Sequence, residues 1–81
     1  MTTIMDATIK AGIKLDLERA TNAVATSQYR IAQYTGFVSE FEVSNPDIAE
    51  YYRFTADQEQ ARLTYFESRI PEILTELERY D

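Results

Sequence analysis

The chain of 81 residues contains no cysteine, no histidine and no tryptophan. Without cysteine it forms no disulfide and offers no thiolate nucleophile. Without histidine it lacks the commonest general base, the commonest transition-metal ligand and the partner that activates a serine in a catalytic triad. We therefore predict no catalytic residues, no metal site, no cofactor and no enzymatic activity.

Glycine and proline are also scarce, with two residues of each. The two glycines lie too far apart for a glycine-rich phosphate loop. No apolar run approaches the length of a membrane span, and residues 1–6 lack the basic start and apolar core of a secretory signal. We expect no membrane partner and a cytoplasmic protein, in the producing cell or in its host.

The formal net charge of −6 is unevenly distributed. Residues 1–39 carry a net charge of +1, whereas residues 40–81 carry −7. A nucleic-acid-binding surface needs a basic face that displaces counterions. The acidic second half therefore argues against direct binding of nucleic acid.

Two runs of apolar or small residues follow the alternating spacing of three and four that is typical of coiled-coil helices. We call them the inner seam. The first run is Ile13, Leu17, Ala20, Val24, Ser27, Ile31, Tyr34, Val38 and Phe41. The second is Ala49, Tyr52, Ala56, Glu59, Leu63, Phe66, Ile70, Ile73, Leu77 and Tyr80.

The segment between the two runs carries the signals of a helix boundary. The residue before Pro46 is disfavoured in the helical conformation, so the first helix should end before Asn45. Asn45 is a good N-cap and Pro46 suits the first helical position. Thr3 and Asp6 have the spacing of a capping box. We predict one helical-hairpin domain over residues 1–81, with helices at about 4–42 and 46–80 and a turn at about 43–46.

Two residues interrupt this pattern. Gly36 lies inside the first helix and weakens it, so an earlier end there is an alternative. Pro71 lies inside the second helix and removes one backbone hydrogen bond. Because the seam keeps its phase across Pro71, we expect a kink rather than a break.

The two seams also predict how the helices pair. Folding the chain back at Asn45 brings together residues whose numbers sum to 90, and the seams then face each other along their whole length. Large residues tend to meet small ones, as Tyr34 meets Ala56, which favours close packing. We predict an all-α fold of two long antiparallel helices, coiled-coil-like, that assembles into a helical bundle such as a four-helix bundle.

Several large apolar residues lie outside the seam. The second helix carries Tyr51, Phe54 and Tyr65 at heptad spacing, which we call the outer stripe. The first helix carries Met5, Ile9, Leu15, Tyr29 and Phe37. We predict that the outer stripe, with Tyr29 and Leu15, forms an interface with another copy of the chain, giving a dimer, or with a protein partner.

Glu59 is the one charged residue of the seam. In the predicted register its layer lies beside Arg30, and we expect an ion pair between them. One interpretation is a carboxylate that reaches the edge of the seam to meet Arg30. A second is a polar layer that specifies register or oligomeric state, and a third is a binding role for Glu59.

These observations predict a small, non-catalytic interaction module that oligomerises and regulates or inhibits a partner protein. A first alternative is an acidic antagonist that mimics nucleic acid, of the antirestriction or anti-CRISPR kind, with Glu50, Asp57 and Glu67 as its acidic face. A second is an oligomer that sequesters a ligand. Its candidate phosphate contacts are Lys10, Lys14, Arg19 and Arg30.

Overall fold

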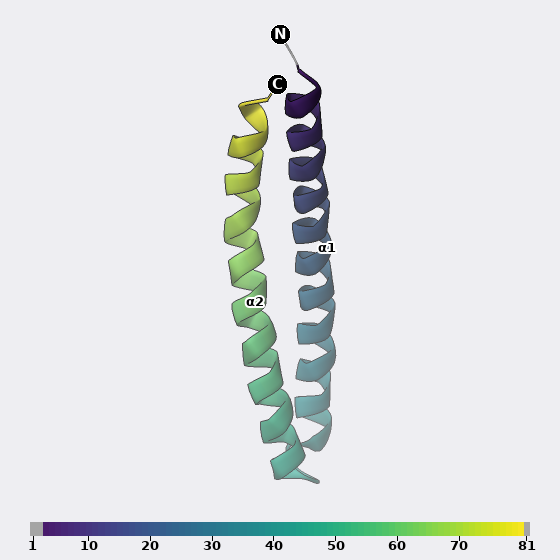
Figure 1. The fold of residues 1–81 in the computed structure, drawn as a ribbon. Helices are drawn as coiled ribbons and strands as arrows, with labels where there is room; N and C mark the ends of the chain where they lie inside the picture. Colours follow the sequence, from purple (N-terminus) through teal and green to yellow (C-terminus); the bar gives the residue numbers. More distant parts are fainter. Residues whose placement is uncertain (1–2, 81) are drawn as a thin grey trace.

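The computed structural model describes residues 3–80 and contains two helices, α1 (Ile4–Phe41) and α2 (Pro46–Glu78). They run antiparallel, so that the start of α1 and the end of α2 lie at the same end of the molecule (Figure 1). The all-α hairpin is therefore as predicted, with α1 ending one residue earlier and α2 two residues earlier than expected. The Cα radius of gyration is 18.4 Å. A compact domain of this length would have about 12 Å.

Local side-chain chemistry starts both helices. Thr3 Oγ1 accepts a hydrogen bond from the Asp6 amide at 3.0 Å, and the Asp6 carboxylate accepts one from the Thr3 amide, which completes the capping box. Asn45 Oδ1 accepts from the Ile48 amide at the start of α2, and Pro46 follows it at the first helical position. The hairpin thus turns where the sequence signals place the turn.

The two residues that interrupt the pattern leave the helices continuous. α1 passes through Gly36 and ends at Phe41, so the alternative of an earlier end is wrong. No glycine within residues 3–80 has a positive φ, so Gly36 keeps ordinary helical geometry. α2 continues through Pro71 and curves gently along its length (Figure 1).

The inner seam forms the contact between the helices. Every seam residue is buried or half-buried, and none is exposed. Phe37 and Tyr52, whose numbers sum to 89, have ring centroids 4.9 Å apart. Arg30 and Glu59 also sum to 89 and form an ion pair. Both sums lie within one of the predicted 90, so the register agrees with the prediction. Phe37 contacts Tyr52, whereas we expected Phe37 to lie outside the contact between the helices.

The core of the hairpin is small. Within residues 3–80, the buried residues are Ile13, Ala20, Ser27, Ala49, Leu63 and Ile73. The accessible surface of 6018 Å² exceeds the roughly 5,000 Å² of a compact protein of this mass. Two helices cover only one stripe of each other, so most of each helix surface stays exposed.

Candidate functional site

The outer stripe contains the three most exposed large apolar side chains of α2. Tyr51, Phe54 and Tyr65 are 63%, 61% and 59% exposed. At about 100° per residue their directions fall within an arc of about 60° on one side of the helix. Gln58 and Ala61 lie between them and complete an alternating spacing of three and four. The stripe therefore has the residue pattern of a second helix-packing seam without a helix against it.

Two rings of the outer stripe rest against rings of the inner seam. The Tyr51 ring meets Tyr52 edge-on, with centroids 5.4 Å apart, and the Tyr65 ring meets Phe66 edge-on at 5.0 Å. Edge-to-face contacts of this kind are favourable. They hold the outer rings in defined orientations, which lowers the entropy that an interface would otherwise lose on ordering them.

The other two predicted interface residues lie on the opposite side of the molecule. Tyr29 is 68% exposed and Leu15 44% exposed, both on α1. Tyr29 is two residues from Ser27 and from Ile31, so it points away from α2. Phe54 points away from α1 for the same reason, being two residues from seam positions on α2. The structure therefore separates the predicted interface into two surfaces.

The three acidic residues proposed as one face are all exposed. Glu50 and Asp57 are seven residues apart and share a direction. Glu67 follows Asp57 by ten residues, which turns it about 80° around the helix axis. Only Glu50 and Asp57 therefore line up, and Glu67 stands on a neighbouring side of α2.

Two residues in the middle of the seam, Ser27 and Glu59, have polar side chains that are only partly hydrogen-bonded. Arg30 donates to Glu59 Oε1 at 3.3 Å, which is the ion pair that the register predicts. The Glu59 side chain is only 14% exposed, whereas that of Arg30 is 45% exposed. Glu59 Oε2 and Ser27 Oγ are buried, and neither has a hydrogen-bond partner among residues 3–80. The middle of the seam therefore contains incompletely satisfied polar groups.

A groove of about 470 Å³ lies along one side of the hairpin. Asp16, Arg19, Ala20 and Ala23 line it from α1. Arg62, Tyr65, Phe66, Arg69 and Ile73 line it from α2. The lining combines three guanidinium groups with two aromatic rings. Cations from both helices therefore face a common space in this groove.

Arg62 and Arg69 were not among the phosphate contacts predicted from the sequence. Of the predicted contacts Lys10, Lys14, Arg19 and Arg30, Arg19 alone lines the groove. Arg62 and Arg69 are seven residues apart, and each directly precedes a seam residue. Extending the register from the seam to its flanking positions places them on the side of α2 that faces Arg19. This signal was present in the sequence but lies outside the apolar pattern.

Within residues 3–80, no group of acidic side chains is arranged to hold a metal ion. Neither helix of that range has a segment apolar and long enough to cross a membrane. Comparison with protein-family models, with curated proteins and with solved structures finds no match to this chain. The candidate sites are therefore argued from the outer stripe and the groove themselves.

Proposed function

We propose that this protein is a small, non-catalytic helical module that self-associates through the outer stripe of α2 and regulates or inhibits a partner protein. The observation that carries the proposal is the exposure of three aromatic side chains at heptad spacing on a helix with no neighbour on that side. Isolated exposed apolar residues are ordinary, but an aligned set of aromatics is typical of an interface.

The outer stripe is self-complementary in one arrangement. Two α2 helices that pack antiparallel around a twofold axis at Gln58 bring Tyr51 of one copy against Tyr65 of the other. Phe54 then meets Ala61 of the second copy, which pairs a large residue with a small one. The resulting dimer contains four helices, with the two α2 helices in contact at its centre and one α1 helix on each outer side.

The shape of the hairpin supplies enough surface for such a dimer. Its Cα extents are 64 × 15 × 12 Å, so the area of one long side is comparable with the roughly 800 Å² that each partner of a stable complex buries. Tyr29 and Leu15 stay exposed on α1 in this dimer. We assign them to the regulated protein partner, in a cytoplasmic setting.

Light scattering after size exclusion tests the self-association. The wild-type chain at about 100 μM, well above common dissociation constants, should have at least twice the 9.4 kDa mass of one chain. Phe54→Ser should keep the helical circular dichroism but reduce the mass to that of a monomer, because interface aromatics commonly contribute 2 kcal/mol or more. Tyr29→Ser is the matched control, since it removes an equally exposed ring from α1 and should leave the mass unchanged. A monomeric wild type, or a mass that responds to Tyr29→Ser alone, contradicts the proposal.

Nucleic-acid mimicry is the second candidate, supported by the −7 charge of residues 40–81 and by the aligned carboxylates of Glu50 and Asp57. It requires a target that binds DNA or RNA, and competition that weakens with salt. Reversing Glu50, Asp57 and Glu67 to lysine should abolish that competition. Because Glu67 stands apart, the double reversal of Glu50 and Asp57 should have nearly the full effect.

A further inference from the structure

We propose that the groove between α1 and α2 is a binding site for a nucleoside phosphate, with the phosphates held by Arg19, Arg62 and Arg69 and the base stacked on Tyr65. The inference goes beyond self-association, because all of these residues belong to one chain; Tyr65 is shared with the outer stripe, so its ring serves one of the two roles at a time. It follows from the charge, the rings and the size of the groove.

The charge of the groove is opposite to that of the molecule. Its lining carries three arginines and one aspartate, a net charge of +2, in a chain whose formal net charge is −6. Arg69 pairs with Glu72 at 3.0 Å. Arg19 and Arg62 form no ion pair with any residue in 3–80, although acidic residues outnumber basic ones in the chain. Arg19 and Arg62 therefore line the groove without a salt bridge in that range, and a multiply charged anion in the groove gains favourable interactions with both.

The guanidinium groups are held ready for an anion. The Arg62 guanidinium carbon lies 5.7 Å from the centroid of the Phe66 ring, a cation–π contact that restrains its long side chain. Glu72 orients Arg69 in the same way through its ion pair. Arginine suits this task because its planar fork donates two parallel hydrogen bonds to one phosphate group.

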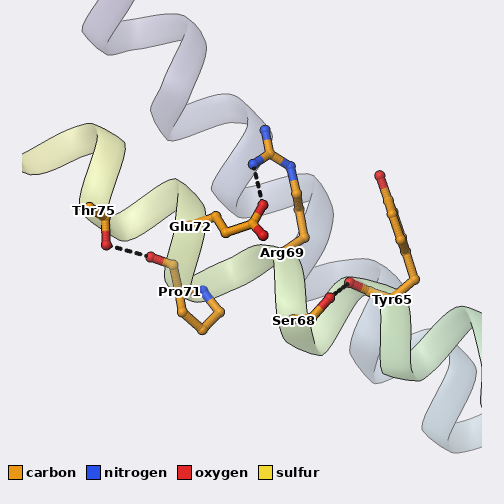
Figure 2. Close-up of polar contacts among 6 residues, drawn as sticks. All are labelled: Tyr65, Ser68, Arg69, Pro71, Glu72 and Thr75. Atoms are coloured by element: carbon orange, nitrogen blue, oxygen red, sulfur yellow. Dashed lines mark hydrogen bonds and ion pairs between the residues drawn. The ribbon is translucent and has the colours of Figure 1, made fainter.

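The aromatic part of the groove provides a surface for a flat ring. Tyr65 and Arg69 project on the same side of α2 (Figure 2), and both line the groove. Tyr65 remains 59% exposed although its edge rests on Phe66. Stacking of a base on an exposed aromatic ring contributes about 1–3 kcal/mol in single-stranded nucleic-acid sites. The stacking ring and the phosphate-binding groups therefore lie within one site.

The size of the groove favours a ligand larger than a single anion. Small-molecule sites usually measure about 300–1,000 Å³, and the groove at about 470 Å³ falls in this range. Ala20 and Ala23 keep the α1 wall low, which leaves space opposite the rings. Inorganic phosphate would occupy only a small part of this volume and would not use Tyr65. A nucleoside phosphate uses both halves of the groove.

Calorimetric titration of the full chain with ATP tests the proposal, with adenosine, inorganic triphosphate and hexaglutamate as comparison ligands. ATP should bind, and each comparison ligand should bind at least tenfold more weakly. Arg62→Gln and Arg19→Gln should each weaken ATP binding at least about tenfold, since hydrogen bonds to charged groups have effects of this size. Tyr65→Ala should reduce the advantage of ATP over triphosphate.

Arg53→Gln is the matched control, because Arg53 pairs with Glu42 and does not line the groove. It should leave ATP binding unchanged. Phe54→Ser should also retain binding, because Phe54 does not line the groove and loss of self-association leaves Tyr65, which belongs to both surfaces, free to stack on the base. No ATP binding at 1 mM ligand overturns the proposal, as do equal losses from Arg53→Gln and Arg62→Gln. Equal binding of triphosphate removes the role of the base, and equal binding of hexaglutamate identifies an acidic peptide site instead.

Discussion

Ser27 and Glu59 are polar residues at neighbouring positions of an otherwise apolar seam. Ser27 is 1% exposed, and its hydroxyl has no hydrogen-bond partner in the described part of the chain. Arg30 donates to one carboxylate oxygen of Glu59, and the other oxygen is buried without a partner in that same part. Buried polar groups without hydrogen bonds are destabilising. The middle of the seam is therefore its weakest part, and a small substitution there should reveal this.

Ser27→Ala should raise the free energy of unfolding by about 1 kcal/mol, because it removes an unsatisfied buried hydroxyl at nearly constant volume. Urea denaturation followed by circular dichroism measures the change. Ser39→Ala is the control, since Ser39 is exposed on the same helix and the substitution alters helix propensity equally. If Ser27→Ala is no more stable than Ser39→Ala, the hydroxyl is satisfied by water.

Ile73 is a buried apolar residue of the seam, 2% exposed, and belongs to the core cluster with Ile13 and Ala20. Ile73→Ala should lower the free energy of unfolding by about 2–5 kcal/mol, enough to remove most helicity from so small a domain. Its neighbour Leu74 is 45% exposed, and Leu74→Ala should change stability far less. Equal effects in thermal melts of the two variants would contradict the seam described above.

Phe66→Ala should lower the free energy of unfolding by less than Ile73→Ala does, because Phe66 is only half-buried.

At the scale of the elements, Pro71 is the feature of α2 that local physics disfavours. Proline supplies no amide hydrogen, so the Glu67 carbonyl lacks its helical partner. Nevertheless α2 continues to Glu78, because seam residues on both sides of Pro71 pack against α1. Thr75 Oγ1 donates to the Pro71 carbonyl at 3.0 Å within the following turn (Figure 2).

Pro71→Ala should therefore stabilise the hairpin, by up to about 3 kcal/mol, through the restored hydrogen bond and higher helix propensity. Pro71 is exposed, so the substitution leaves no cavity. An increase in melting temperature, measured at one fixed protein concentration, is the expected result. A decrease would mean that the curvature of α2 at Pro71 is needed for its packing on α1.

At the scale of the whole molecule, the length of the hairpin and its thin core govern stability. The described chain forms a rod with a 64 Å long axis and six buried residues. A rod of two helices buries less apolar surface than a compact domain of equal mass. Association of two rods along the outer stripe would recover part of that burial.

The melting temperature of the wild-type chain should accordingly rise with protein concentration, because association stabilises the folded form by mass action. Melts across a hundredfold range of concentration measure this. The Phe54→Ser variant should melt at a lower temperature that does not depend on concentration. A wild-type melting temperature that stays constant across the range would show that the hairpin is stable as a monomer.

The sequence by itself determined the two helices, the turn and the pairing register. These depend on local chemistry, such as capping by Thr3 and Asn45, and on an apolar repeat that allows one face of each helix to be buried. The continuation of α1 through Gly36 needed the tertiary structure, because packing on both sides outweighs a propensity cost of about 1 kcal/mol. The position of Phe37 against Tyr52 also became clear only from the tertiary structure.

The candidate sites divide in the same way. Heptad spacing alone identified the outer stripe, since the side on which a helical residue lies follows from its number. The tertiary structure alone separated Tyr29 and Leu15 from that stripe and brought Arg19 to Arg62 and Arg69 across the groove. The physical reason is that a groove depends on the distance between two helices and on the directions of long side chains. The spacing of residues along one helix contains neither quantity.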